Sequence, residues 1–365
     1  MTLTNVLILV SGLILLVVGA ELLVKGASKL AAILGISPLI IGLTIVAYGT
    51  SAPEMAVSIM SSFAGQADIA IGNVLGSNIF NILLILGVSA LVTPLVVARQ
   101  IIRSDVPIMI GVSVLLLIFG LDGKISRVDS TIFFIGGVIY TISLAYQSRQ
   151  QNDNSDGDEF ATEYSFSGDI SWSIWVKYLL FILGGSGLLT FGSRWLVDSA
   201  TDIARAFGVS ELLIGLTIIS MGTSLPELAT SIMASLRGER DIAVGNVLGS
   251  NIFNILAVLG IAGIVAPDGI AVPQAAIEFN APVAVAVAFA CLPIFYSGSQ
   301  INRWEGLLFT FYYFAYTSYL ILDAVNHDSL PIYTTVMLFF IIPLTVITLI
   351  TVVVQEKRSK RKRLR

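Results

Sequence analysis

The sequence is poor in the residues that build disulfide frameworks, soft-metal sites and hydrolytic centres. Its 365 residues include one cysteine, Cys291, and one histidine, His327. A single cysteine excludes an intramolecular disulfide, and its apolar surroundings predict a packed side chain. His327 lies in a polar turn, where we expect neither a catalytic nor a metal-binding role. Because no nucleophile, base and orienting group form a recognisable set, we do not predict an enzyme or a bound cofactor.

Charge is also scarce. Charged residues make up 12% of the chain and hydrophobic residues 56%, and the mean hydropathy is +0.90. A soluble domain carries roughly 25% charged residues. The charges lie between long apolar runs, as expected where burying a charge in hydrocarbon is costly. The first run starts at Val6 without a preceding basic segment and continues past Val18, so it predicts a membrane span rather than a cleaved signal peptide. The pattern predicts an all-α, multi-pass membrane protein.

Eleven apolar stretches approach the length of about 20 residues that a membrane-spanning helix needs. They are 5–27, 37–64, 69–95, 104–121, 130–148, 173–198, 210–236, 241–266, 275–296, 303–323 and 331–354. An acidic segment, 149–172, interrupts the series, and we interpret it as a solvated cytoplasmic linker rather than a regulatory calcium site. The predicted organisation is a five-helix unit over 1–148, the linker, a second five-helix unit over 173–323, and an extra helix with a basic tail over 324–365.

The basic residues predict the orientation, because they favour the cytoplasmic side. With the N-terminus outside, the cytoplasmic flanks hold Lys25, Lys29, Arg99, Arg103, Arg149, Lys177, Arg237, Arg240 and Arg303, and the basic run 357–363. The outer flanks then hold Lys124, Arg127, Arg194 and Arg205. We therefore expect a plasma-membrane or inner-membrane protein with a cytoplasmic C-terminus. The tail is predicted to contact anionic lipid and no nucleic acid.

An internal repeat organises the chain. Residues 38–87 align with 211–260 at a constant offset of 173, and 34 of those 50 positions are identical. The segment 72–83 recurs unchanged at 245–256. Because each unit contains an odd number of spans, equivalent helices are expected to cross the membrane in opposite directions. Such inverted repeats are typical of secondary transporters that alternate access around a central site.

Two glutamates lie in the middle of repeated spans. Glu54 and Glu227 are flanked by no lysine or arginine within their own spans or the next repeat helix. An ionisable residue at that depth predicts a functional site. Two pairs in the first and sixth spans, Glu21 with Lys25 and Arg194 with Asp198, are four residues apart, so we expect local ion pairs there.

The neighbours of these glutamates supply further oxygen atoms. Thr50 and Ser51 lie within one turn of Glu54, and Thr223 and Ser224 within one turn of Glu227. Pro53 and Pro226 each stand four residues after a glycine, Gly49 or Gly222, and cannot donate a helical hydrogen bond. We therefore predict two broken helices, which are tolerated at membrane depth only where they face protein or water.

The second segment of each repeat adds serine and asparagine. Ser77 and Asn81, with their counterparts Ser250 and Asn254, are one turn apart on one helix face. Asn78 and Asn251 are equally consistent with ligands or with hydrogen bonds between helices. All candidate ligands are oxygens, which favours hard cations such as sodium and calcium. Protons are expected to compete, because two nearby carboxylates resist joint ionisation.

The paired segments Gly-Thr-Ser-x-Pro-Glu and Gly-Asn-x-x-Gly-Ser-Asn-Ile-x-Asn closely resemble the α-repeats of the sodium/calcium exchanger family, in the calcium/cation antiporter superfamily, and most of all its prokaryotic members. The resemblance implies ten core helices, with the first and sixth sliding across the other eight. It implies that Glu54 and Glu227 bind both calcium and sodium. It also implies ion-coordinating roles, through side-chain or backbone oxygens, for Thr50, Thr223, Ser51, Ser224, Ser77, Ser250, Asn81, Asn254, Ala47 and Ser220.

The expected function is therefore exchange of sodium for calcium by alternating access, with a monomer sufficient for transport and the oligomeric state left open. Asn254 stands where potassium-dependent exchangers have aspartate, which argues against potassium cotransport. Ser220 differs from its counterpart Ala47. The main alternative is a proton-coupled calcium or cation exchanger that uses the same glutamates. A cation channel is less compatible with paired broken helices in an inverted repeat.

Overall fold

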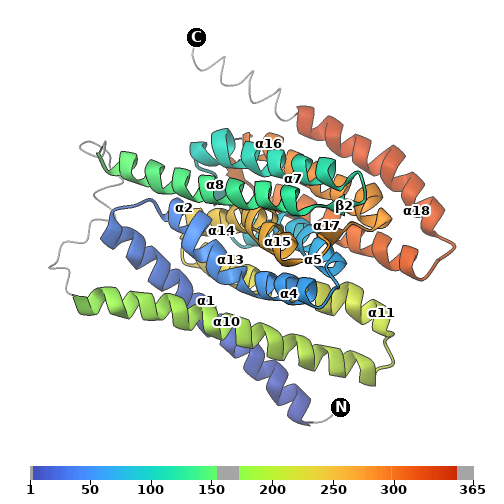
Figure 1. Cartoon of the computed structure of the whole chain (residues 1–365), viewed down its shortest axis with the longest axis horizontal. Coiled ribbons are helices and arrows are strands. Elements are labelled where there is room, and N and C mark those ends of the chain that lie inside the picture. Colours follow the sequence, from blue (N-terminus) through green and yellow to red (C-terminus); the bar gives the residue numbers. More distant parts are fainter. Residues whose placement is uncertain (1–2, 154–171, 297, 352–365) are drawn as a thin grey trace.

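The computed structural model describes residues 3–153, 172–296 and 298–351, which form a bundle of helices (Figure 1). Eight of the described helices are long and apolar enough to cross a membrane. A ninth candidate is a bent pair, Pro38–Thr50 and Ala52–Phe63, with 47° between its parts. The other two expected spans are also helical, one of them divided into short pieces over 211–236 and the other continuous over Arg303–Ala324.

The helices and strands follow one another along the chain as two series. The first half contains α1 (Leu3–Leu34), α2 (Pro38–Ile41), η1 (Gly42–Val46), α3 (Ala47–Thr50), α4 (Ala52–Phe63), α5 (Asp68–Phe80), η2 (Asn81–Leu86), α6 (Gly87–Val92), β1 (Leu95–Val96), η3 (Ile101–Asp105), α7 (Val106–Gly120), β2 (Lys124–Ile125) and α8 (Arg127–Asp153). The second half contains α10 (Trp172–Ala206), α11 (Glu211–Ile214), η4 (Gly215–Ile219), α12 (Ser220–Gly222), α13 (Leu225–Leu236), α14 (Arg240–Phe253), η5 (Asn254–Leu259), α15 (Gly260–Val265), β3 (Ile270–Ala271), η6 (Ala276–Asn280), α16 (Ala281–Tyr296), β4 (Gln300–Ile301), α17 (Arg303–Ala324), α18 (Leu330–Val336) and η7 (Met337–Ile341).

The internal repeat of the sequence is also a repeat of structure. The π-helical segments η1 and η4 begin 173 residues apart, and so do η2 and η5. A π-helical turn inserts one residue into a helix and is often found at a functional site. Each half therefore has the same irregularities at matching positions, which is expected of two copies of one folding unit.

Short strands join the two halves. β1 pairs antiparallel with β4, and β2 pairs antiparallel with β3, so each pair contains one strand from each half. The loops between membrane helices are thereby tied to one another, and their backbone groups are hydrogen-bonded rather than left unpaired.

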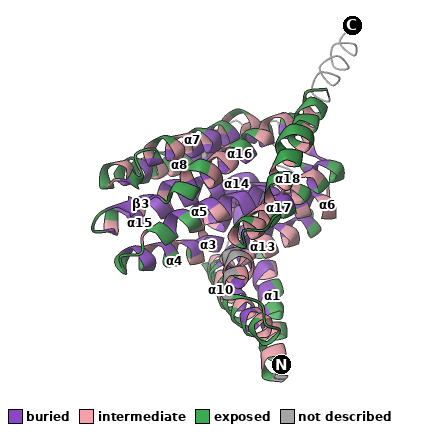
Figure 2. Ribbon diagram, turned by 90° about the vertical axis from the view of Figure 1, so that its right-hand side faces the viewer, coloured by how far each residue is buried: buried purple, intermediate pink, exposed green. Residues whose placement is uncertain are grey.

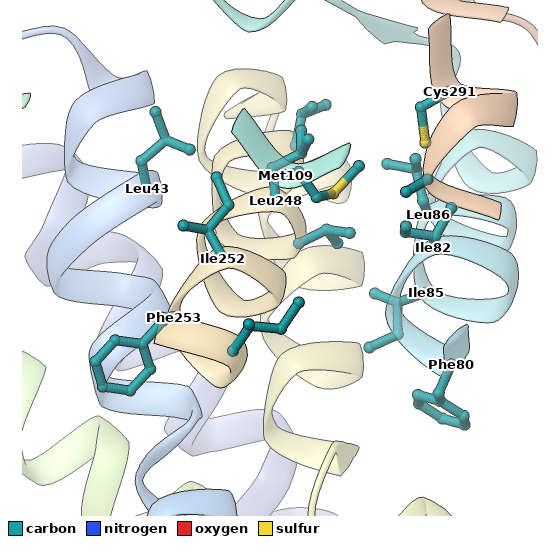
Figure 3. Packing of buried hydrophobic residues seen from close by; sticks show 14 of the residues in the cluster. Leu43, Phe80, Ile82, Ile85, Leu86, Met109, Leu248, Ile252, Phe253 and Cys291 are labelled. Atoms are coloured by element: carbon teal, nitrogen blue, oxygen red, sulfur yellow. The ribbon is translucent and has the colours of Figure 1, made fainter. Parts of the chain in front are cut away.

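The centre of the bundle is formed by the helices that carry the most repeated sequence. In the candidate spans 68–92 and 240–265, 78% and 83% of the most apolar stretch is buried, against 17% for the spans beginning at Arg127 and Trp172. Figure 3 shows side chains of this core, in which Leu248 of α14 lies beside Met109, and Ile82 and Leu86 of η2 lie beside Cys291. The two repeat helices are therefore the interior of the protein.

Helices α1 and α10 cross each other on one side of the bundle, and α18 lies on the other side (Figure 1). Glycines bring α1 and α10 into backbone contact. A Cβ atom added to Gly185 would lie 2.8 Å from the carbonyl oxygen of Gly19, and one added to Gly192 would lie 2.8 Å from that of Gly12. Such close approach is typical of helix pairs in membranes that pack through small residues.

Several boundaries differ from the sequence-based expectation. α1 extends to Leu34 and α10 to Ala206, beyond the predicted ends at 27 and 198. α8 continues to Asp153, into the segment interpreted as a linker. Hydropathy alone placed the ends too early, because a helix can continue past the apolar stretch. Residues 154–171 of the linker and the basic run 357–363 lie outside the described residues.

The expected pairing of Glu21 was wrong. Its carboxylate pairs with Arg237, at the end of α13, rather than with Lys25 one turn along its own helix. Ser28 of α1 also donates a hydrogen bond to Glu239, in the turn before α14. In the part of the chain that the structure describes, Arg194 and Asp198 form no ion pair either. The first helix is thus connected to the end of α13 by polar contacts that spacing along one helix does not reveal.

Candidate ion-binding site

Both predicted helix breaks are present, and each has a serine at its centre. Ser51, between α3 and α4, has φ −80° and ψ 10°, and Ser224, between α12 and α13, has φ −90° and ψ 6°. Pro53 and Pro226 stand in the first turn of the helix that follows, where a proline is tolerated. Glu54 and Glu227 therefore lie in the first turns of α4 and α13, close to the free N–H groups of each helix start.

The two breaks meet and exchange hydrogen bonds. The Ser51 hydroxyl donates to Oε1 of Glu227 over 2.8 Å, and the Ser224 hydroxyl donates to Oε1 of Glu54 over 2.9 Å. Both carboxylates are fully buried, and each accepts a hydrogen bond from the helix break that precedes the other. Ser250 lies 3.4 Å from the same oxygen of Glu227. The structure thus brings together the two glutamates that the repeat predicted.

Two further asparagines, Asn73 and Asn246, hold the broken helices in place. Thr50 donates to Oδ1 of Asn246 over 3.0 Å, and Thr223 donates to Oδ1 of Asn73 over 3.2 Å. The amide group of Asn73 in turn donates to the backbone carbonyl of Glu54. Asn246 makes the corresponding contact with the carbonyl of Glu227 over 3.4 Å. We did not predict these residues, although both lie in the segment that recurs unchanged, which was the available signal.

Four asparagines form a second crossed network. The side-chain amides of Asn78 and Asn251 donate to each other's backbone carbonyls, over 3.1 and 3.3 Å. Asn81 donates to Oδ1 of Asn251, and Asn254 donates to Oδ1 of Asn78, over 2.9 and 3.1 Å. Asn78 and Asn251 therefore connect the helices α5 and α14. Their bonds also fix the amide nitrogens of Asn81 and Asn254, so that the oxygens of these two residues are left for another partner.

Among the predicted site residues whose side chains the structure describes, five buried oxygens accept no hydrogen bond from the protein. These are Oε2 of both glutamates, Oγ of Ser77, and Oδ1 of Asn81 and Asn254. A buried polar atom without a partner is costly, so a cluster of them points to a ligand. In the part of the chain that the structure describes, neither glutamate pairs with a lysine or arginine. The arrangement can therefore accommodate positive charge that comes from outside the protein.

The remaining predicted residues lie in the same region. Thr50 is fully buried and Thr223 is partly buried, each at the end of the helix before a break. The carbonyl of Ala47 accepts a bond from the Ser51 backbone, and the Thr50 hydroxyl lies 3.3 Å from it. Ser220 begins α12, but its side chain lies outside what the structure describes. Within the described residues, no three histidine, cysteine or acidic side chains form a cluster, so a cation here would rely on two carboxylates and neutral oxygens.

Long apolar helices around a buried group of unpaired oxygens are typical of multi-pass membrane transporters. The family model described as "Sodium/calcium exchanger protein" matches residues 4–148 and 177–322. The chain therefore belongs to the sodium/calcium exchanger family. Members of this family are cation antiporters rather than enzymes, which makes this chain a membrane transporter that exchanges calcium or related cations.

The similarity to individual relatives extends over almost their whole length. The chain is 41% identical to the putative antiporter CaxA of Alkalimonas amylolytica, with 87% of this chain and 98% of CaxA covered. It is 32% identical to the sodium/calcium exchanger MaX1 of Methanosarcina acetivorans, with the same coverage. The solved structure of the exchanger NCX_Mj soaked with Na⁺ and Sr²⁺ superposes with a TM-score of 0.74 at 29% identity, covering 87% of this chain and 99% of that protein.

Proposed function

We propose that this protein exchanges sodium for calcium across the membrane, with Glu54 and Glu227 as ligands that both ions share. The observation that carries the proposal is the crossed pair of serine–glutamate bonds, which leaves one oxygen of each carboxylate without a partner. Two ionised carboxylates balance the charge of one calcium ion. Because sodium ions need the same oxygens, occupancy by one kind of ion excludes the other, and such exclusion is sufficient for antiport.

The proposed ligand set extends from the carboxylates to neutral oxygens. Calcium takes about 6–8 oxygen ligands, and two carboxylates cannot supply all of them. Ser77, Asn81 and Asn254 contribute the other unpaired oxygens. Ser51, Ser224 and Ser250 can turn their hydroxyl hydrogens away from the carboxylates and offer lone pairs instead. The hydroxyls or carbonyls of Thr50, Thr223, Ala47 and Ser220 complete the proposed set.

Alternating access would come from movement of α1 and α10 against the other helices. Backbone contact through the glycines of these two helices favours their moving as one unit. The Glu21–Arg237 and Ser28–Glu239 contacts attach α1 to the end of α13. When α1 moves, either these contacts would break or the end of α13 would move with α1. We propose ten core spans arranged as two inverted five-helix units, 1–148 and 173–323, joined by the segment 149–172, with Leu330–Thr351 as an eleventh span.

The proposed orientation places the N-terminus outside and the C-terminus in the cytoplasm. The distribution of lysine and arginine supports it, because the opposite orientation would put most basic flanks outside. We further propose the plasma or inner membrane as the location. Labelling of single cysteines at positions 123 and 238, after Cys291→Ser, would test the orientation. A membrane-impermeant maleimide should reach position 123 from outside and position 238 only after permeabilisation.

Proton coupling is the alternative. Two neighbouring buried carboxylates without a basic partner favour proton binding as well as cation binding. Calcium uptake into vesicles that contain the purified protein distinguishes sodium coupling from proton coupling. Imposed sodium gradients at constant pH should drive uptake of radioactive calcium, and proton gradients without sodium should not. Uptake that follows the proton gradient and ignores sodium would contradict the sodium proposal and support the alternative.

A further inference from the structure

A cavity of about 530 Å³ lies on the opposite side of the bundle from α1 and α10. Its inner wall comes from α16, α17 and the segments η2 and η6, and includes Leu83, Phe279 and Phe309. Its outer wall comes from α18, η7 and the residues that follow, up to Leu349. The family model ends at residue 322, so this outer wall lies beyond the part shared with the family. The cavity contains none of the candidate ion ligands.

The cavity offers almost no polar group to a ligand. None of its lining residues is charged, and its polar side-chain groups are the hydroxyls of four tyrosines and two threonines. Tyr312 bonds to Thr345, Tyr316 to Asn280, and Tyr333 to the carbonyl of Ala315. Thr334 and Thr345 each donate to a carbonyl of their own helix, and Tyr319 stacks on Phe279. Since five of these six hydroxyls are already hydrogen-bonded, water or a polar ligand would gain little there.

The outer wall of the cavity lies at the periphery of the bundle, where a membrane-spanning helix would meet lipid. No residue in the most apolar stretch of the span 330–351 is buried, and Figure 2 shows α18 in the colours of exposed and intermediate residues at the edge of the bundle. On the outer wall, Leu338 and Val346 are 55% and 49% exposed, whereas Ile294 on the inner wall is fully buried. The cavity therefore lies between an exposed apolar outer wall and a buried apolar inner wall.

We propose that this cavity is a binding site for one acyl chain of a bilayer phospholipid. Its volume is within the roughly 300–1,000 Å³ typical of ligand pockets. A transmembrane helix about 10 Å wide and 30 Å long occupies roughly 2,000 Å³, several times more. A hydrocarbon chain is a single file of methylene groups and enters such a slot from the side. The lipid would fill the space that the few contacts between α17 and α18 leave open.

The acyl chain would contact the protein close to the ion site without being part of it. Leu83 is in the same π-helical segment as Asn81, two residues further on. Phe279 precedes Asn280, which accepts the bond from Tyr316. Occupancy would therefore stabilise the irregular segments η2 and η6 from their outer side. This inference does not depend on which ion drives calcium transport.

Photocrosslinking tests the proposal on the full-length protein. The protein is reconstituted in phosphatidylglycerol vesicles that contain a small fraction of phospholipid with a diazirine in one acyl chain. After illumination, mass spectrometry gives the share of adducts on lining residues such as Phe279, Met337 and Val346, relative to outward residues of the span 330–351. We expect the lining residues to carry several-fold more adducts than equally exposed outward residues.

Two variants fill the cavity from opposite walls, and a third serves as the matched control. Ala290→Trp and Val346→Trp place bulk in the space and should reduce adducts on the remaining lining residues at least fivefold. Ile347 is the next residue, 61% exposed, and does not line the cavity. Ile347→Trp should leave the adduct pattern unchanged. Adducts spread evenly over the span 330–351 in the unaltered protein, or a pattern that no filling variant changes, would overturn the proposal. Labelling by a free diazirine fatty acid but not by the phospholipid would also overturn it.

Discussion

Ser51 in the first copy of the repeat donates its hydroxyl hydrogen to Glu227 in the second copy, and not to the glutamate three residues away in its own helix. The reciprocal bond from Ser224 to Glu54 has almost the same length. Each carboxylate is therefore positioned by the other half of the molecule. Neither copy of the repeat could build this site alone, and a movement that separates the halves would change both carboxylates at once.

The crossed bonds predict similar effects for two substitutions that are 173 residues apart. Ser51→Ala and Ser224→Ala each remove a hydrogen bond to a charged group, which contributes about 1.5–3 kcal/mol. We expect the calcium concentration for half-maximal uptake to rise about tenfold or more in both. Ser113→Ala is the control, because that buried serine bonds only to Met109 on its own helix. A normal half-maximal concentration in either site variant would contradict the assigned geometry.

The asparagine Asn246 predicts a second effect on transport. It accepts a bond from Thr50 and donates to Ser231, so Asn246→Ala frees both hydroxyls and loosens the break before α4. We expect the apparent sodium affinity, measured as sodium-dependent calcium uptake, to fall several-fold. Asn73→Ala should act alike, because Asn73 makes the matching bonds to Thr223 and Ser58. Unchanged sodium dependence in both variants would limit these residues to a structural role.

A buried carboxylate outside the site provides a prediction about stability. Asp105 ends η3 and accepts a bond from Tyr140 over 3.0 Å. In the second half, Asn280 ends η6 and accepts the matching bond from Tyr316 over 2.8 Å. Because the amide of Asn280 accepts this hydrogen bond in the second half, Asp105→Asn should leave both transport and the thermal unfolding temperature unchanged.

Asp105→Ala, in contrast, leaves the buried Tyr140 hydroxyl without its acceptor. An unsatisfied buried group costs about 1–3 kcal/mol. We therefore expect a lower unfolding temperature in detergent, with the sodium dependence of the remaining transport unaltered. Loss of transport in Asp105→Asn, with normal stability, would show instead that the charge of Asp105 takes part in ion movement.

The contact between α1 and α10 predicts different outcomes for two neighbouring glycines. A Cβ atom at Gly185 would lie 2.7 Å from the backbone nitrogen of Leu23, whereas one at Gly184 would meet nothing within 4 Å. Gly185→Ala should push the helices apart and slow sodium-dependent calcium uptake. Gly184→Ala should transport normally, and it should be slightly more stable, since alanine favours helix. Equal transport by the two variants would contradict the joint movement of α1 and α10.

The sequence predicted which helices carry the site residues. It did not predict which of their side chains form hydrogen bonds with one another. Spacing placed Ser51 on the same turn as Glu54, and the glycine–proline pairs predicted the breaks. Spacing along one helix does not show which other helix lies opposite. The crossed partners, and the part played by Asn73 and Asn246, follow only from the packing of two copies against each other.

The same reason explains the other differences. Glu21 was expected to pair four residues along its helix, but the turn after α13 brings Arg237 to it from 216 positions away. The π-helical segments were not predicted, because one inserted residue does not change the hydropathy pattern of a segment in which nearly every position is apolar. Helix ends were predicted too early for α1 and α10, since polar residues that still belong to the helix resemble a loop in composition.

Loss of either central carboxylate is the sharpest test of the proposed exchange. Purified protein is reconstituted in sodium-loaded vesicles, and uptake of radioactive calcium is followed after dilution into sodium-free medium. Glu54→Gln and Glu227→Gln keep the shape of the side chain but remove the charge that would balance calcium. The control is Glu278→Gln, at an exposed position of another membrane helix. We expect both site variants to lose uptake while the control retains it, and normal uptake in either site variant would contradict the shared-ligand mechanism.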